Sequence, residues 1–239
     1  MQRLSTTPPK TGRLLLLRHA QGSLGTDDYD RLSPLGWRQA QRLGERLRLD
    51  GQINQAVAVY RGSLRRHRET TEAFRLANPE HIDASLDEYT VDRLIGAALD
   101  QAHSLGLDVP ASDAFEHPQA YLNAFLEWFP SVLAHWQSNA LVCGHNGTWG
   151  QFQSRVTRPL PLWREAVSAG HTVMAVTSAG VISTIVADAL GEPLSWQREC
   201  NVRLYNASVT ELRWTGSDWE LVKLNCIEHL PMVAEQTLA

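Results

Sequence analysis

Four consecutive leucines, Leu14 to Leu17, lie near the start of the 239-residue chain and lead directly into the pair Arg18-His19. An apolar run this short is typical of a strand that is buried on both faces of a parallel sheet. In an open α/β sheet, ligands bind at the carboxyl edge of the strands, where the arginine and the histidine would lie. A guanidinium binds phosphate oxygens in pairs and an imidazole can attack phosphorus, so the stretch predicts a phosphate site. The alternative is a chance Arg-His pair after a core strand.

Other strand and helix patterns follow along the chain. Ser33-Pro34 predicts the start of one helix, and Ser63 is predicted to cap a second helix that continues through Phe74. Apolar or alternating residues predict strands at 56–60, 172–176, 202–214 and 219–224. Because strands alternate with helices, we expect an α/β three-layer sandwich, with a mostly parallel central sheet and helices on both faces.

The chain is predicted to form one domain over 13–239, after a loose leader over 1–12 that contains two prolines. Between about 95 and 165 the pattern is helical and carries a stripe of aromatic residues. Such a stripe is typical of packed core rather than of a ligand site. We therefore expect this region to be a helical cap inserted into the domain.

Charge and composition exclude several classes of function. The formal net charge is −4, so nothing in the charge balance points to nucleic acid or to an anionic membrane surface. No apolar run is long enough to span a membrane, and residues 1–12 lack the apolar core of a signal peptide, so a cytoplasmic protein is expected. The three cysteines are too scattered for a metal site or a disulfide framework.

Five motifs in order resemble those of the histidine phosphatase superfamily, which includes the phosphoglycerate mutases. They are Leu17-Arg18-His19-Ala20-Gln21, Asp30-Arg31-Leu32-Ser33-Pro34-Leu35-Gly36, Gly62-Ser63-Leu64-Arg65-Arg66 with Glu69-Thr70, Leu86-Asp87-Glu88, and the carboxyl-terminal Asn206-Ala207-Ser208-Val209-Thr210 with His229-Leu230. The resemblance covers nearly the whole chain and is least marked between about 95 and 145.

The resemblance implies a role for each matching residue. His19 would be the nucleophile that forms a phosphohistidine, which divides one difficult displacement into two easier ones. Arg18 and Arg66 would bind the phosphoryl oxygens. For Arg66 the alternative is a solvated helix face, because Arg65 and Arg68 stand beside it.

The resemblance also implies that Glu88 protonates the leaving oxygen and later activates water, although Asp87 and Asp92 compete for this role. Three residues of the loop after the first strand would contact the substrate: Gln21, Ser23 and Tyr29.

The main departure from the family pattern is at residue 178. The family normally has a second histidine after the third strand, and here Ser178 stands in its place. A serine hydroxyl can still donate a hydrogen bond to the phosphoryl group, but it carries no charge. His145 is not expected to replace the missing imidazole because it lies in the cap region, and His171 precedes the strand and should lie at its opposite edge.

These observations predict hydrolysis of a small phosphate monoester through His19, with a mutase less favoured. The alternative is a phosphate-binding or regulatory descendant of the family in which turnover is impaired. No metal or cofactor is expected, because two guanidiniums already supply positive charge at the site. The partners expected are a small phosphorylated substrate, no nucleic acid and no membrane, with the chain a monomer or a homodimer.

Overall fold

The computed structural model describes residues 12–23, 26, 28–111 and 118–238, so the predicted leader lies outside the described residues except for its last position. The strands are β1 (Arg13–Arg18), β2 (Ala56–Arg61), β3 (His81–Ile82), β4 (Thr172–Thr177), β5 (Val209–Trp214) and β6 (Trp219–Cys226). The helices are α1 (Pro34–Leu49), α2 (Gln52–Gln55), α3 (Arg65–Glu72), α4 (Val91–Leu105), α5 (Pro118–Gln137), α6 (Trp149–Thr157), α7 (Leu160–Ser168), α8 (Ala179–Leu190) and α9 (Leu194–Arg203). Two short 3₁₀ turns are η1 (Ala84–Leu86) and η3 (Val233–Glu235).

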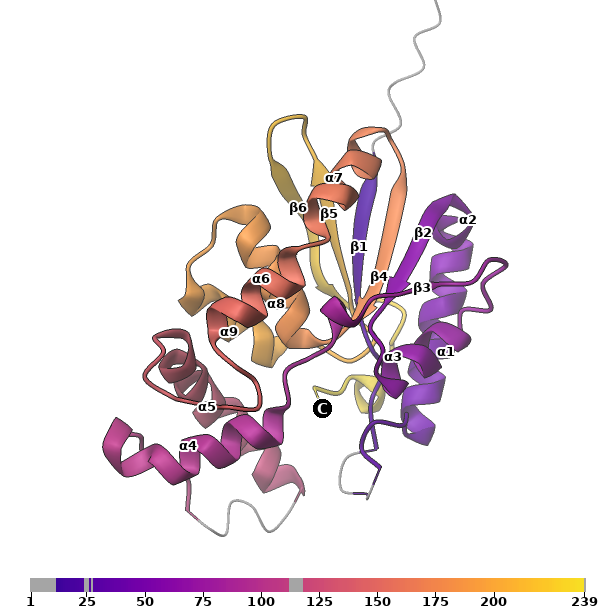
Figure 1. Ribbon diagram of the computed structural model, residues 1–239. Coiled ribbons are helices and arrows are strands. Elements are labelled where there is room, and N and C mark those ends of the chain that lie inside the picture. Colours follow the sequence, from indigo (N-terminus) through magenta and orange to yellow (C-terminus); the bar gives the residue numbers. More distant parts are fainter. Residues whose placement is uncertain (1–11, 24–25, 27, 112–117, 239) are drawn as a thin grey trace, which may run out of the picture.

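The strands form one six-stranded sheet in the order β3-β2-β4-β1-β5-β6 (Figure 1). The first four strands in this order are parallel, whereas β5 and β6 form an antiparallel pair at one edge. In the register of β1 with β4, Arg18 lies opposite Thr177. The residues that follow these two strands, His19 and Ser178, therefore emerge side by side at the carboxyl edge of the sheet.

The leucines of β1 are buried on both faces, as the sequence predicts. Leu14 and Leu16 pack into a cluster with side chains of the helices that follow residue 90, whereas Leu15 and Leu17 pack with residues of α1. Successive strand residues point to opposite faces, so a continuous apolar run stabilises a strand that is covered on both sides. The predicted three-layer α/β fold is confirmed.

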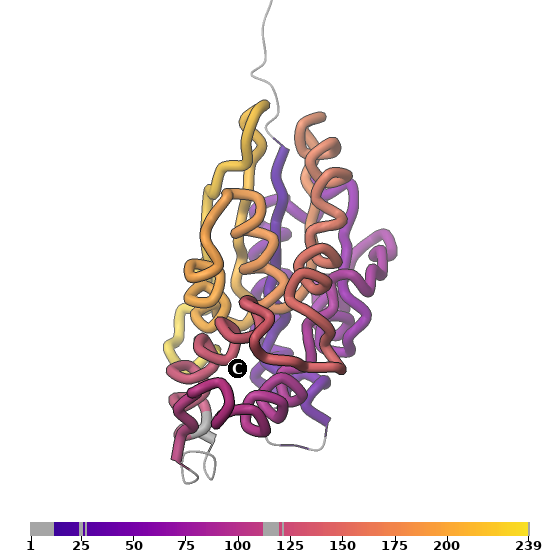
Figure 2. Tube along the Cα trace, turned by 60° about the vertical axis from the view of Figure 1, so that its left-hand side comes forward, coloured from indigo at the N-terminus to yellow at the C-terminus, as the bar shows by residue number. Residues whose placement is uncertain are grey.

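The helices divide between the two faces and the carboxyl edge of the sheet. Helices α1, α2 and α3 lie on one face, and α6, α7, α8 and α9 lie on the other (Figure 1). Helices α4 and α5 lie beyond the carboxyl ends of the parallel strands, as both views show (Figures 1 and 2). Within the described residues no helix is both long and apolar enough to cross a membrane.

Two local predictions were wrong. The strand predicted over 202–214 begins only at Val209, because α9 continues to Arg203 and a turn with Ala207 in the left-handed region follows. Ser63 does not cap α3: the N-cap residue is Leu64, and the Ser63 hydroxyl instead donates a hydrogen bond to Asp87. By contrast, Ser33 caps α1 as predicted, with its hydroxyl accepting from the Gly36 N–H.

Candidate active site

A small cavity of about 70 Å³ lies at the carboxyl edge of the sheet. Its polar lining residues are Arg18, His19, Arg66, Glu88, Ser178 and Asn201, and its other lining residues are Tyr89, Val91, Phe125, Leu126, Phe129, Ala179, Val202 and Leu238. The five residues that the sequence assigned to catalysis and phosphate binding thus lie around one space. Helix α5 contributes three apolar lining residues, Phe125, Leu126 and Phe129.

The His19 imidazole is held in one tautomer. Its Nδ1 atom lies 2.7 Å from the Ala20 carbonyl oxygen, which can only accept, so Nδ1 carries the hydrogen. Its Nε2 atom accepts from Nε of Arg66 at 3.2 Å and therefore carries a lone pair. Burial and the neighbouring cations Arg66 and Arg18 lower the pKa of His19 well below its usual value of 6.5. The imidazole is therefore neutral at physiological pH, with a lone pair on Nε2.

Three backbone hydrogen bonds fix the chain around this histidine. The His19 N–H donates to the Thr177 carbonyl at 2.8 Å, and the Ala20 N–H donates to the Thr70 hydroxyl at 3.1 Å. The His19 carbonyl accepts from the Ala207 N–H at 3.1 Å. The partners come from β4, α3 and the turn before β5, so the sheet and one helix together determine where the imidazole lies.

Two guanidiniums line the cavity beside His19. Arg18 is buried and donates to the Leu204 carbonyl, but its Nε atom has no hydrogen-bond partner within the described residues. Burial lowers the pKa of Arg18 to about 10, so its charge is kept at neutral pH. An unpaired N–H on a buried cation is costly, and an anion bound in the cavity would satisfy it.

Arg66 is not part of a solvated helix face. Its side chain is only 11% exposed, its Nη1 donates to Asp30 at 2.6 Å, and its guanidinium stacks over the Tyr29 ring at 5.5 Å. By contrast, the side chains of Arg65 and Arg68 are about half exposed and form ion pairs along the helix surface. The structure therefore places Arg66 on the inner side of α3.

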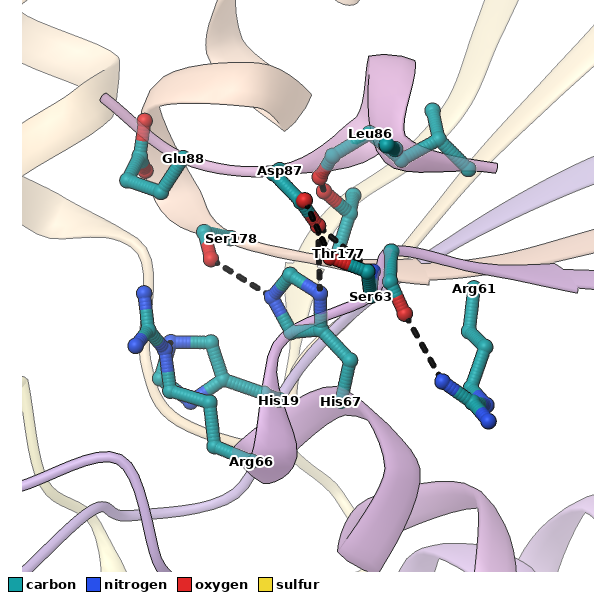
Figure 3. Close-up of polar contacts among 12 residues, drawn as sticks. His19, Arg61, Ser63, Arg66, His67, Leu86, Asp87, Glu88, Thr177 and Ser178 are labelled. Carbon is teal, nitrogen blue, oxygen red and sulfur yellow. Dashed lines mark hydrogen bonds and ion pairs between the residues drawn. The ribbon is translucent and has the colours of Figure 1, made fainter. Parts of the chain in front are cut away.

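The Glu88 carboxylate also lines the cavity. Its Oε2 atom accepts from the Gly180 N–H at 2.8 Å, and its Oε1 atom accepts from the Tyr89 N–H at 3.1 Å. The segment before it is fixed by the Thr177 hydroxyl, which donates to the Leu86 carbonyl (Figure 3). Burial raises the pKa of Glu88 against the lowering effect of these N–H groups. A carboxyl group with a raised pKa is suited to protonating a leaving oxygen.

Comparison with known families gives one match, which covers nearly the whole chain. The model of the histidine phosphatase superfamily (branch 1) matches residues 14–227. The chain belongs to this family. Comparison with curated proteins finds no match.

Solved structures show that the fold is shared with two phosphatases and with one further protein. A mycobacterial glucosyl-3-phosphoglycerate phosphatase with inorganic phosphate is 22% identical, with a TM-score of 0.58 over 92% of this chain and 99% of that one. A phosphoserine phosphatase from Entamoeba histolytica in complex with phosphoserine is 14% identical, with a TM-score of 0.60 over 92% of this chain and 99% of that one. YhfR from Bacillus stearothermophilus is 19% identical, with a TM-score of 0.60 over 91% of this chain and 98% of that one.

The competing carboxylates do not line the cavity of this histidine phosphatase. Asp87 turns away from the cavity and accepts from the N–H and the hydroxyl of Ser63, at 2.6 and 2.5 Å (Figure 3). Asp92 is exposed on the first turn of α4. Glu88 is the acidic residue that the structure brings to His19.

The three residues that were expected to contact the substrate lie in the loop after β1 but outside the lining of the cavity. The Gln21 side chain accepts from the Ser33 hydroxyl at 2.7 Å. Ser23 is buried, and its N–H donates to the Arg31 carbonyl at 2.9 Å. Tyr29 contacts a lining residue, because the Arg66 guanidinium lies over its ring. Their roles toward a substrate stay predictions.

One histidine that the sequence reasoning missed lies directly behind the cavity. His67 is wholly buried on α3, its Nε2 atom is 2.8 Å from the Ser178 hydroxyl oxygen, and its ring centroid is 5.6 Å from that of His19 (Figure 3). His145 and His171, the two histidines weighed from the sequence as replacements, are both exposed and line no part of the cavity. The available signal was a histidine immediately after Arg66, inside a motif already assigned to the site.

No group of three or more histidine, cysteine, aspartate or glutamate side chains is placed to hold a metal ion in the part of the chain that the structure describes. Positive charge at the site comes from Arg18 and Arg66. The arrangement brings together a neutral imidazole, two guanidiniums and a carboxyl group of raised pKa. That set can bind a phosphoryl group, attack it and protonate its leaving oxygen.

Proposed function

We propose that the chain hydrolyses a small phosphate monoester through a phosphohistidine intermediate on His19. The observation that carries the proposal is the orientation of this imidazole, because Nδ1 donates to a carbonyl and leaves the Nε2 lone pair in the cavity. Membership of the histidine phosphatase superfamily supports the same chemistry.

In the first step the phosphoryl oxygens bind between Arg18 and Arg66, and Arg66 exchanges its hydrogen bond to His19 for one to the phosphate. Nε2 of His19 attacks phosphorus, the bond from phosphorus to the ester oxygen breaks, and Glu88 transfers its proton to that oxygen. In the second step the water oxygen attacks phosphorus, the bond between phosphorus and Nε2 of His19 breaks, and Glu88 accepts a proton from that water. Inorganic phosphate leaves, and both His19 and Glu88 return to their starting protonation states.

The substrate is proposed to enter beneath the helical cap predicted between about 95 and 165. Phe125 and Phe129 of α5 form part of the cavity wall, so the alcohol portion of the ester would meet an apolar surface as well as charged groups. The names of two similar structures, a glucosyl-3-phosphoglycerate phosphatase and a phosphoserine phosphatase, also favour a small phosphorylated metabolite. The reaction is proposed to need no metal or cofactor.

A screen of phosphate monoesters with the purified chain tests this function. The wild type should release inorganic phosphate, and His19→Ala should abolish the release. His171→Ala is the matched control, because His171 is exposed and distant from the cavity lining. A rapidly quenched reaction should carry an acid-labile phosphoryl label on His19. Phosphate release that survives His19→Ala, or a label on Ser178 with His19 unlabelled, would contradict the proposal.

The second candidate is a phosphate-binding descendant with impaired turnover. It rests on Ser178, because His19 is the single histidine in the described lining of the cavity. This candidate predicts that inorganic phosphate binds and that no monoester in the screen is hydrolysed above the His19→Ala background.

A further inference from the structure

The pair formed by His67 and Ser178 has no role in the mechanism given above. The two side chains are 0% and 2% exposed, and Nε2 of His67 lies 2.8 Å from Oγ of Ser178. Ser178 lines the cavity and His67 does not, so the serine hydroxyl is the group through which hydrogen bonding links His67 to a bound phosphoryl group.

A hydroxyl group has one hydrogen to donate and lone pairs that accept. If Ser178 donates to His67, its oxygen presents only lone pairs to the cavity and repels a phosphoryl anion. If His67 donates to Ser178, the hydroxyl hydrogen is free for a phosphoryl oxygen. The direction of this one hydrogen bond therefore decides whether Ser178 assists or opposes binding of the anion.

The surroundings of His67 allow the hydrogen to reside on Nε2. The other ring nitrogen, Nδ1, is buried without a hydrogen-bond partner in the described part of the chain, and the nearest carboxylate oxygen, on Asp87, is 4.0 Å away. That carboxylate already accepts both the N–H and the O–H of Ser63, so it does not require a hydrogen on Nδ1. A phosphoryl anion in the cavity then favours the arrangement in which Ser178 donates to it.

We propose that His67 is a positioning residue of the active site: its Nε2–H donates to Ser178, which thereby presents its own hydroxyl hydrogen to a phosphoryl oxygen. This inference rests on the proposed function. It means that the imidazole which the family pattern predicts after β4 is supplied from α3 instead, one hydroxyl group away from the phosphate. Burying an imidazole with one unpaired nitrogen costs free energy, and packing alone does not explain why the chain carries that cost.

A double-mutant cycle tests the coupling on the best monoester from the screen. The variants are Ser178→Ala, His67→Leu, the double variant and His67→Gln, whose amide N–H₂ can still donate near the position of Nε2. Ser183→Ala is the matched control, because Ser183 is a buried serine within α8, the helix whose N-cap residue is Ser178, and lies outside the cavity lining. Melting temperatures of all variants check that each one folds.

Ser178→Ala is expected to lower kcat about 100-fold, as the loss of one preorganised donor does, with a smaller effect on KM. His67→Leu should lower kcat at least about 10-fold, yet adding it to Ser178→Ala should cause no more than about a twofold further loss, because the two side chains act as one unit. His67→Gln should retain most of the activity.

Two results would overturn the inference: losses that multiply in the double variant, or His67→Gln as impaired as His67→Leu although it folds. If hydrolysis is too slow to measure, the same cycle is read as the affinity for inorganic phosphate, with the same expected coupling. Failure of the proposed function itself is distinct, since it appears as hydrolysis that does not depend on His19 or as no hydrolysis above the His19→Ala background.

Discussion

Moving the imidazole from position 67 to position 178 gives the sharpest test of how this site is packed. The family pattern suggests that Ser178→His should improve the site by adding a charged donor. The structure predicts the opposite for that single change, because His67 is wholly buried with its Nε2 2.8 Å from the Ser178 oxygen. The new imidazole needs the space that the existing imidazole fills.

The cost of the single change follows from this contact. Forcing an extra ring into a packed core typically costs about 1–3 kcal/mol. For a chain of this length each kcal/mol lowers the melting temperature by about 2–4 °C, so Ser178→His should melt about 2–12 °C below the wild type. Its kcat should fall rather than rise, because a displaced His67 or His19 no longer holds its hydrogen bonds.

The combined variant His67→Ala/Ser178→His vacates the space and should recover the lost stability. The imidazole at position 178 can then donate directly to the phosphoryl group, and kcat should be about 100-fold above that of His67→Ala alone, the value of one restored donor. Melting curves and steady-state hydrolysis of the best monoester measure both effects. If Ser178→His alone melts like the wild type and is as fast as the combined variant, His67 does not occupy the space that an imidazole at position 178 needs, and the reasoning is refuted.

Three further predictions follow from the same geometry. Glu88→Gln should lower kcat about 100-fold or more for alkyl phosphates but little for an aryl phosphate with an acidic leaving group, and equal losses on both would argue against a general acid. Gly180→Ala should resemble Glu88→Gln, because a Cβ at this position would collide with the Glu88 carboxylate and the Tyr89 ring; unchanged hydrolysis of alkyl phosphates would show that the carboxylate's position is unimportant. Burial holds the pKa values of His19 and His67 below 6.5. As the pH falls through about 6.5, the unfolded chain therefore gains protons that the folded chain does not. The free energy of unfolding should fall by up to about 1.4 kcal/mol per pH unit for each histidine. Burial raises the pKa of Glu88, which opposes this loss between that raised pKa and 4.5. The free energy of unfolding, measured by urea denaturation at a series of pH values, should depend less steeply on pH in His67→Gln, by the equivalent of one proton. An unchanged dependence on pH would mean that His67 is protonated in the folded chain.

The amino-acid sequence by itself determined the strand that anchors the site and most of the groups that surround it. The apolar run of β1 can be stable only where both faces are covered, so it predicted a central strand with Arg18 and His19 at its carboxyl edge. Arg66 and Glu88 followed from the family motifs, and the structure brings both to the same cavity. Parallel strands end at one edge, which is why residues so distant in sequence could be assigned to one place.

Other features were decided only by tertiary structure. The choice of Glu88 over Asp87 depends on which carboxylate the Gly180 N–H reaches and which one Ser63 binds. Residues 202 and 203, predicted as the start of a strand, belong to α9. Packing of this helix against α5 and α8 outweighs the local alternation of apolar and polar residues. Local patterns carry no information about such competition between partners.

The pairing of His67 with Ser178 is the clearest case. The two residues are 111 positions apart, and each has an ordinary local reason to be where it is, one within a basic helix and one at a strand end. Only the packing of α3 against the carboxyl end of β4 brings the imidazole to the hydroxyl, because β1, β2 and β4 are held in register by the sheet. The sequence determined that an imidazole is missing after β4, and the tertiary structure decided where another one lies.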